Sequence, residues 1–427
     1  MRAAWRVLKG QRDLRLVLSA GLVSSCGDWI LLIGLLYRVY TMTGSTVASA
    51  LTMLSAGVPQ VLLGPVAGVF ADRWDRKRTM ITADVLLAVG LLPLLAVHGP
   101  AQVWLVFLVL IWEGAIAQFF SPAQQAMVPQ LVPDDQLLVA NALGGQVGDI
   151  ARLVGSALGG VLAALGGINT VTAVDSVSFL ASAVLLASIR TGDRRTARQA
   201  PNMPRLTGVI TDLRDGLRII SARRTLRILM AFGIATSVGE GIFATLITPF
   251  VQHVLHGSSQ QFGLIAAAQG IGGIAGGVFA AAVSQRIPAS RLLGYGALAF
   301  GVVDLAIFLY PLGYLAIWPA IVGMIITGLP GALTVAGMLT LLQRNTPDAY
   351  RGRLFGTLGA AQGTAVLVGT LAAGYLSRPL GIIPVVAVPG AIWAAAGLAI
   401  TIWLRMDTDT VAEEPSLGPL PAEIAEI

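Results

Sequence analysis

Two acidic residues stand near the middle of long apolar segments, one in each half of the chain. Asp28 lies in Ser25–Ile30 (SCGDWI), and Glu240 lies in the similar Ser237–Ile242 (SVGEGI), 212 residues later. A carboxylate at the centre of a lipid bilayer is disfavoured by about 2.5–3.5 kcal/mol on insertion scales, so it is retained for a function. Its recurrence in matching motifs predicts a duplicated membrane fold with polar chemistry at the midplane.

Other ionisable residues fall at similar depth, and the candidates for substrate or proton coupling are Asp28, Glu113, Asp149, Arg152 and Glu240. Desolvation and mutual repulsion favour the protonated form of crowded carboxyl groups, which is the property that proton exchange requires. We expect Asp28 and Glu240 to recognise a cation or exchange protons, with hydrogen-bonded helix packing as the alternative. Glu113 fits either role.

Asp149 and Arg152 are three residues apart on one predicted helix, so they could form a structural or switching ion pair. Direct contact of either side chain with a ligand is the alternative. Three further acids are expected to be structural and partly hydrated: Asp175 and Asp304 toward the outer ends of their apolar segments, and Asp84 toward the inner end. Asp175 is placed there because its segment is expected to run from Val171 to Ile189.

Aromatic side chains could line a cavity beside these acids, and the candidates are Trp29, Trp112, Phe119 and Phe243. An apolar, aromatic and acidic cavity suits amphipathic cations through burial and cation–π contact.

The elements that must position these residues are membrane-spanning helices. The chain has 427 residues, of which 55% are hydrophobic and 12% charged, a balance too apolar for a soluble protein. It contains about twelve apolar stretches of roughly 18–27 residues, near the ~20 that a helix needs to cross ~30 Å of hydrocarbon. The sequence therefore predicts an all-α polytopic membrane protein, because a membrane β-barrel would show short alternating segments instead.

Basic residues define the expected orientation. With a cytoplasmic N-terminus, 25 of the 28 Lys and Arg residues fall on the cytoplasmic side, and only Arg38, Arg152 and Arg378 do not. The positive-inside rule thus predicts a multi-pass membrane protein with both termini in the cytoplasm. This asymmetry explains the net positive charge without any nucleic-acid partner. The abundance of Arg over Lys is typical of a GC-rich bacterium, so the expected location is a bacterial inner membrane.

Four regions follow from these patterns: an N-terminal six-helix bundle (1–190), a cytoplasmic linker (191–225), a C-terminal six-helix bundle (226–405) and a disordered acidic tail (406–427). Within the linker, Leu213, Leu217 and Ile220 share one helical face, which fits a helix on the anionic inner leaflet or, alternatively, a solvated tether.

Short matches between the halves support a duplication. Gly68 corresponds to Gly277 at an offset of 209 residues, and Gly160 corresponds to Gly374 at an offset of 214. The ordered matches and nearly constant offset predict two six-helix bundles in parallel repeat.

The segment Gly68–Arg78 (GVFADRWDRKR) resembles the signature loop between the second and third helices of the major facilitator superfamily. Further segments, including Pro347-Asp348 and Arg351-Gly352-Arg353, are similar to the bacterial drug-efflux branch that contains macrolide and enterobactin exporters. Many drug–proton antiporters of the superfamily carry an Arg within the fourth helix, where this chain has Glu113. The resemblance implies the major facilitator fold over nearly the whole chain.

The same resemblance implies a cytoplasmic gate formed by Gly68, Asp72, Arg73, Arg76, Lys77 and Arg78. Asp72 would approach the N-terminus of the eleventh helix near Arg353 and hold the cytoplasmic side closed. The basic residues would attach the loop to neighbouring helices and lipid phosphates. For Lys77 and Arg78 we favour the alternative of simple positive-inside anchoring.

By this resemblance the chain is a secondary active transporter that exports hydrophobic or cationic small molecules by proton antiport and alternating access. Its expected partners are the substrate, protons and membrane lipids, and we expect a monomer. One alternative is a carrier of a specific metabolite, siderophore or lysolipid with different or no proton coupling. A non-transporting receptor or channel on the same fold is the second alternative.

Other chemistry finds little support in the sequence. Cys26 is the only cysteine, which excludes an internal disulfide and a cysteine metal cluster. Neither of the two lysines ends a phosphate-binding glycine loop. The three histidines fall in predicted outer loops, so we expect no metal site, no cofactor and no enzyme.

Overall fold

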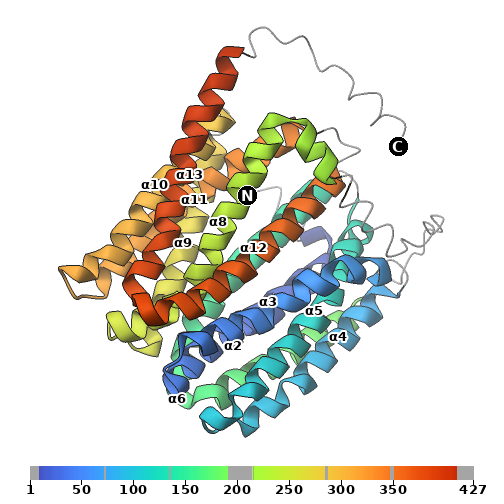
Figure 1. Cartoon of the computed structure of the whole chain (residues 1–427). Coiled ribbons are helices and arrows are strands. Elements are labelled where there is room, and N and C mark those ends of the chain that lie inside the picture. The colour runs from blue at the N-terminus through green and yellow to red at the C-terminus, as the bar shows by residue number, and fades with distance from the viewer. Residues whose placement is uncertain are drawn as a thin grey trace.

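The computed structural model of the protein describes residues 9–71, 74–133, 136–190, 214, 216–283, 287–346 and 351–410. Helices make up the regular structure of these ranges (Figure 1). The long ones are α2 (Arg12–Thr43), α3 (Thr46–Ala71), α4 (Arg76–Gly90), α5 (Val103–Leu131), α6 (Leu137–Ala187), α8 (Arg224–Pro249), α9 (Ser259–Val283), α10 (Ala289–Leu309), α11 (Trp318–Arg344), α12 (Arg351–Leu380) and α13 (Ile382–Thr410). Short helical turns lie between some of them: η1 (Leu92–Ala96), η2 (Pro100–Gln102), η4 (Phe250–Val254) and η5 (Tyr310–Leu312).

The predicted set of about twelve crossings is confirmed. Within the described ranges, 11 helices are long and apolar enough to span a membrane. One of them, α6, has 51 residues, about 77 Å of helix and more than two bilayer crossings. It is broken at Gly167 (φ 65°, ψ −146°), so 137–166 and 168–187 are two separate arms. The positive φ explains why glycine occupies the break.

Tight glycine turns also join two other helix pairs. Gly44 (φ 60°) lies between α2 and α3, and Gly381 (φ 86°) lies between α12 and α13. Together with Gly167, these residues place three chain reversals at the same end of the molecule.

The helices form two bundles, α2–α6 and α8–α13, which lie beside each other (Figure 1). Each bundle has its own apolar core, for example around Leu31 and Val106 in the first and around Leu229 and Leu293 in the second. Between the bundles, α3 packs on α12 and α6 packs on α9. These two contacts are equivalent in the repeat, because α3 corresponds to α9 and the first arm of α6 corresponds to α12.

At the end that carries the glycine turns, the bundles are joined by two matching hydrogen bonds. The Thr46 hydroxyl donates to the carbonyl oxygen of Gly374 over 3.0 Å. The Ser259 hydroxyl donates to the carbonyl oxygen of Gly160. Thr46 and Ser259 are the first residues of α3 and α9, and Gly160 and Gly374 correspond in the predicted repeat. We call these two bonds the latch and this end of the molecule the closed end.

Further contacts between the bundles surround the latch. The Gln252 amide donates to the Tyr37 carbonyl oxygen over 3.0 Å, and the rings of Tyr37 and Phe262 stack at 6.1 Å. The Arg378 guanidinium approaches the Ser45 hydroxyl at 3.4 Å. All these residues are at helix ends near the glycine turns, so the bundles meet most closely there.

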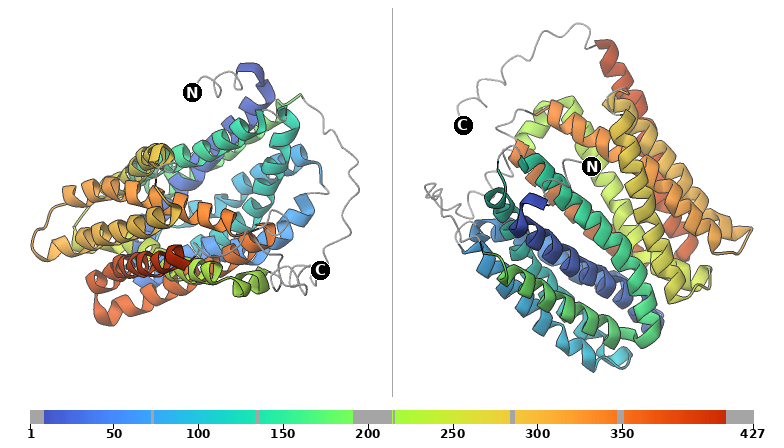
Figure 2. Two further views of the ribbon diagram at one scale, coloured as in Figure 1. Left: turned by 90° about the horizontal axis from the view of Figure 1, so that it is seen from above. Right: turned by 180° about the vertical axis from the view of Figure 1, so that it is seen from behind.

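The same helices separate toward the opposite end, where the described part of the chain begins. The ribbons of the two bundles diverge in that direction (Figure 2). A Cβ added to Gly144 or Gly148 in α6, to Gly277 in α9 or to Gly356 in α12 would meet no atom within 4 Å. In contrast, one added to Gly160 or Gly374 at the closed end would lie within 3 Å of the facing helix. We call the separated end the open end.

Two expectations about the regions outside the bundles need correction. Residues 216–222 are helical as predicted, but Ile220 is buried against the second bundle and is not available to a lipid surface. Leu217 is exposed, and Leu213 lies outside the described residues. In addition, α13 continues to Thr410, so the first residues of the expected disordered tail are helical because they extend the last span. Residues 411–427 lie outside the described ranges.

Candidate functional site

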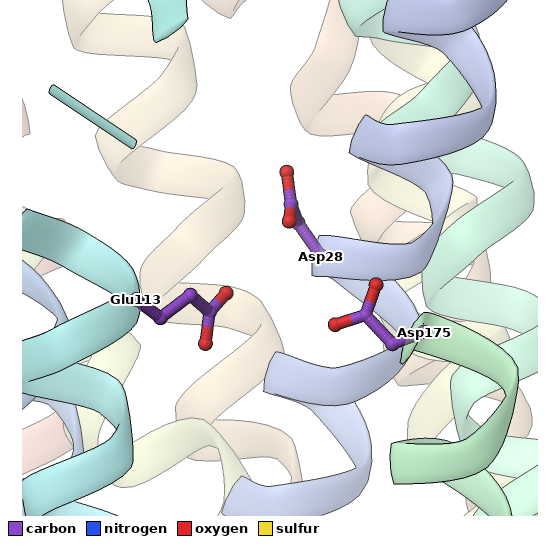
Figure 3. A group of neighbouring side chains, drawn as sticks. All are labelled: Asp28, Glu113 and Asp175. Carbon is purple, nitrogen blue, oxygen red and sulfur yellow. The ribbon is translucent and has the colours of Figure 1, made fainter. Parts of the chain in front are cut away.

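Three carboxyl groups converge inside the first bundle from three different helices (Figure 3). Asp28 comes from α2, Glu113 from α5 and Asp175 from the second arm of α6. One oxygen of each lies within 4.8 Å of the others. We call this group the carboxyl cluster. Carboxylates this close can share protons, and their oxygens could also hold a hard cation.

Gly27 permits this convergence by letting α2 approach α6. A Cβ added at Gly27 would lie only 2.1 Å from Asp175 Oδ1 and from Ser178 Oγ. The Ser178 hydroxyl donates to Asp175 Oδ1 over 3.0 Å and so orients the carboxyl group. Gly27, the residue before Asp28, therefore allows the Asp175 carboxyl group of α6 to lie directly against α2.

The carboxyl cluster is not compensated by nearby positive charge. Among the residues that the structure describes, no Lys, Arg or His nitrogen lies within 4.0 Å of its carboxylates. Asp175 Oδ2 and Glu113 Oε2 are buried and have no hydrogen-bond partner. Each carboxylate left charged in this interior would repel the others, so the cluster is stable only with at least one proton or a bound cation.

The expected hydration of Asp84, Asp175 and Asp304 is wrong. Asp84 and Asp175 are 0% exposed and Asp304 is 4% exposed. Asp84 in α4 is close enough to Asp28 to interact with it electrostatically, so a fourth acid lies beside one member of the carboxyl cluster. For Asp175, the reason is the position at which its helix begins. The second arm of α6 begins near residue 168, earlier than the predicted Val171, and this places Asp175 further into the bundle.

The carboxyl cluster has no counterpart in the described part of the second bundle. Glu240 occupies the position that corresponds to Asp28, but the counterparts of Glu113 and Asp175, at the repeat offset of 214 residues, are Thr327 and Pro389. Gly239 contacts Pro389, as Gly27 contacts Asp175 in the first bundle. The backbone packing is thus duplicated, whereas the acidic chemistry is not.

Glu240 instead lines a narrow cavity with aromatic walls. The lining residues are Gly239, Glu240, Phe243, Gln269, Phe300, Asp304, Pro389 and Trp393. The rings of Phe300 and Trp393 are 4.7 Å apart. We call this the acid–aromatic cavity. Two acids beside three aromatic rings attract positive charge, but the cavity volume of about 10 Å³ has room for about one water molecule, so an organic cation would enter only after the walls move apart.

Phe300, Trp393 and the position of Asp304 in this cavity were not predicted from the sequence. Phe300 and Asp304 are four residues apart on α10, so they share one helical face. That spacing was visible in the sequence, but nothing indicated that the face points toward Glu240. Trp393 lies on α13 and carried no sequence signal.

The other predicted aromatic candidates divide into two groups. Trp29 and Phe243 pack against the apolar cluster that joins the two bundles. Trp112 is 44% exposed, and its indole donates to the Leu86 carbonyl oxygen of α4 over 3.3 Å. Phe119 stacks on Trp74 at 5.8 Å. Neither Trp112 nor Phe119 lines the acid–aromatic cavity.

Arg152 lies at the boundary between the bundles. Its guanidinium lies near Gly273 of α9, and it is close enough to Glu240 to act on it electrostatically. The side chain of Asp149 lies outside the described part of the structure, so the predicted ion pair of Asp149 and Arg152 stays a prediction. Arg152 therefore faces an acid of the opposite bundle.

The predicted cytoplasmic gate is described only in part. Gly68 is in α3, whereas Asp72 and Arg73 lie outside the described residues. Asp75 caps α4 by accepting a hydrogen bond from the Arg78 backbone N–H over 2.7 Å, while Arg76 is the first residue of α4. Lys77 Nζ donates to the carbonyl oxygens of Ala187 and Ile189 at 2.9 and 2.8 Å. Lys77 thus ties α4 to the end of α6.

Known proteins resemble the chain over most of its length. It is 26% identical over 413 residues to an uncharacterized MFS-type transporter, YfiS, of Bacillus subtilis, covering 93% of this chain and 94% of that protein. It is 26% identical to the multidrug efflux pump Tap of Mycolicibacterium fortuitum, covering 86% and 90%. The match to macrolide efflux protein A of Streptococcus pyogenes is 27% identical but covers only 49% of this chain and 52% of that protein.

Solved transporter structures share the fold. A bacterial homologue of the iron transporter ferroportin superposes with a TM-score of 0.72 at 16% identity, covering 92% of this chain and 98% of that one. A D-xylose–proton symporter superposes with a TM-score of 0.69 at 16% identity, covering 91% and 96%. The model of the family described as transmembrane secretion effector matches residues 4–425. The chain is therefore a multi-pass membrane transporter of the major facilitator superfamily and belongs to its transmembrane secretion effector family.

Proposed function

We propose that the protein exports hydrophobic or cationic small molecules across the bacterial inner membrane by proton antiport. It acts as a monomer with both termini in the cytoplasm, in contact with membrane lipids. The observation that carries the proposal is the uncompensated carboxyl cluster of Asp28, Glu113 and Asp175 inside a membrane-spanning bundle. A transporter coupled to protons needs such a group, which gains and loses a proton within the membrane.

The cluster supports proton exchange because its members come from three helices. A change in protonation alters the repulsion among α2, α5 and α6 and therefore the way in which they pack. Since α2 and α6 also contact the second bundle, the protonation state can influence the relative position of the bundles. Protonation of Asp28 would in this way change the contact between the two bundles.

The acid–aromatic cavity supports recognition of a cation. Glu240 and Asp304 supply negative charge, and Phe243, Phe300 and Trp393 supply ring faces. A protonated amine would be attracted by both once the helices around the cavity move apart to admit it. The efflux-pump names of two relatives also favour export.

The closed and open ends support alternating access. By the positive-inside rule the open end faces the cytoplasm, so the structure corresponds to an inward-open state. Rocking of the bundles would break the latch of Thr46 and Ser259 and close the end that carries Lys77. The predicted role of Asp72 and Arg73 in holding that second state remains part of the proposal.

The decisive experiment measures uptake of a fluorescent cationic amphiphile into inside-out vesicles, with and without an imposed proton gradient. Native protein is compared with Asp28→Asn, Glu240→Gln and the control Asp13→Asn, which removes an acid from the first turn of α2. Gradient-driven uptake that is lost in Asp28→Asn and retained in the control would support the proposal. Equal loss in the control would contradict the assigned role.

Two other outcomes favour the alternatives. Absence of uptake by correctly inserted native protein would favour a carrier of a specific metabolite, siderophore or lysolipid. Non-saturable flux that ignores the gradient would favour a channel, and ligand binding without flux would favour a receptor. Saturable, gradient-driven uptake excludes all three as the main activity.

A further inference from the structure

A second, larger cavity opens between α2 and the first arm of α6, at the open end of the molecule. Its volume is about 460 Å³, within the usual range of small-molecule sites. Its walls combine basic, polar and aliphatic side chains: Lys9, Arg15, Leu18, Ser19, Leu22, Leu143, Gln146, Val147 and Ile150. It shares no residue with the carboxyl cluster or the acid–aromatic cavity, so the proposed export function leaves it unexplained.

The chemistry of the walls changes along the helices. Lys9 and Arg15 lie at the start of the described chain, Ser19 follows one turn later, and Leu22 lies deeper along α2. On α6, Gln146 is followed by Ile150 in the same direction. Arg15 and Leu22 are seven residues apart, or about 10 Å along the helix axis. The cavity is therefore cationic at its rim and apolar toward the membrane midplane.

The charge of Arg15 at the rim meets no acidic side chain of the described walls. None of the nine lining residues is acidic. Arg12 lies 3.9 Å from Asp13, whereas Arg15 has no carboxylate within 4.0 Å among the described residues. Arginine presents several N–H donors in a planar fork that matches phosphate and carboxylate groups. Arg15 is thus suited to bind an anionic head group.

We propose that this cavity binds an anionic amphiphile with one apolar chain. Arg15 and Lys9 hold its phosphate or carboxylate head, and Leu22, Val147 and Ile150 contact the chain. The volume of about 460 Å³ favours one chain over two. Because the site is distinct from both acidic sites, it gives the protein a second ligand class of opposite charge to the proposed exported cation.

Simple positive-inside anchoring of α2 is the competing explanation for Arg15 and Lys9. Anchoring requires only positive charge near lipid phosphates, so Arg12 and Arg15 would contribute alike. A binding site in the cavity requires Arg15 and not Arg12, because Arg15 lines the cavity while Arg12 does not. Arg12 therefore provides a matched control on the same helix.

The test is native mass spectrometry of the purified full-length protein with added lysolipids, in the absence of any proton gradient. Lauroyl lysophosphatidylglycerol is the anionic probe, and lauroyl lysophosphatidylcholine has the same chain with a zwitterionic head. Glycerol 3-phosphate tests the head group without the chain. The variants are Arg15→Gln, the control Arg12→Gln, and Ile150→Trp, which fills the apolar part of the cavity at a site that is 41% exposed.

We expect one copy of the anionic lysolipid to bind, and glycerol 3-phosphate not to bind. Arg15→Gln should weaken that binding about 10- to 100-fold, the usual contribution of a charge-assisted hydrogen bond, with Arg12→Gln near native. Ile150→Trp should weaken binding of both lysolipids. Equal effects of Arg15→Gln and Arg12→Gln, or equal affinity for the two lysolipids, would overturn the proposal. Binding is measured without transport, so failure here leaves the export proposal unaffected.

Discussion

The Thr46 hydroxyl binds the Gly374 carbonyl oxygen across the two bundles, and 213 residues later Ser259 binds Gly160 in the same way. Each bond joins the first residue of one helix to a glycine of another helix at the closed end. The sequence repeat therefore produces two equivalent hydrogen bonds between the bundles, and these hold one end of the transporter closed.

Removal of the latch should shift the protein toward the state in which this end is open. A hydrogen bond contributes about 0.5–1.5 kcal/mol, so Thr46→Val together with Ser259→Ala should change the equilibrium about 5- to 150-fold. The shift can be followed by maleimide labelling of Ala373→Cys, a fully buried position beside the latch, in a Cys26→Ser background. Labelling should become faster.

Thr52→Val is the control for this experiment. Thr52 is also buried in α3, but its hydroxyl donates to the Ala48 carbonyl oxygen of its own helix over 2.8 Å. Loss of that bond leaves the contact between the bundles intact. Faster labelling in Thr52→Val as well would show that the latch has no special role.

Neutral variants of the carboxyl cluster should uncouple transport from the proton gradient. Glu113→Gln and Asp175→Asn retain size and hydrogen-bonding groups but cannot exchange a proton at neutral pH. We expect gradient-driven uptake to fall at least about tenfold, because a coupling group is lost outright. Exchange of labelled for unlabelled substrate without a gradient should persist.

The thermal stability of these variants should not fall, although their gradient-driven transport does. Removing one of three mutually repelling acids relieves repulsion in the bundle, so the thermal midpoint of Glu113→Gln should equal or exceed that of native protein. A clear fall in the midpoint would assign Glu113 to packing, which was the alternative role left open for it.

The close approach at Gly27 should not tolerate a methyl group. In Gly27→Ala the new Cβ would lie 2.1 Å from atoms of Asp175 and Ser178, so α2 must move away from α6. Overpacking of this kind costs about 1–3 kcal/mol, and it should lower both the thermal midpoint and gradient-driven transport. Gly144→Ala is the comparison, because its Cβ would meet no atom within 4 Å and should leave the midpoint near native.

The acid–aromatic cavity should distinguish cationic from neutral substrates. Trp393→Leu should raise KM for a cationic substrate about two- to thirtyfold, the range that corresponds to a cation–π contribution of about 0.5–2 kcal/mol. An uncharged analogue of the same shape should be affected much less. Phe119→Leu removes a ring that stacks on Trp74 outside the cavity and serves as the control. Equal changes for both substrates would argue against cation recognition.

The number of crossings and the two-bundle fold could be predicted because both depend on local composition. Apolar length sets each span, and the offset between Gly160 and Gly374 marks the repeat. Asp28 and Glu113 were also recognisable, because each acid interrupts a long apolar segment. None of this requires knowledge of which helix faces are in contact.

The remainder of the site depends on helix ends and helix rotation, which hydropathy does not determine. Asp175 was assigned to the outer end of its span because the segment was expected to begin at Val171, whereas the second arm of α6 begins at residue 168, directly after Gly167. Trp112 and Phe119 were grouped with Trp29 and Phe243, although their helix directs them elsewhere. A helix that is apolar on all sides gives little indication of the face that meets its neighbours.

The three glycine turns at Gly44, Gly167 and Gly381 leave little polypeptide beyond the membrane at the closed end. The connections between the candidate spans there are the segments 97–99, 255–258 and 313–317. A protease added on the side of the membrane that the closed end faces would therefore have these short segments as its principal targets. An inserted epitope tag would be tolerated best in them, since exposed connections accept added residues far more readily than a one-glycine reversal does.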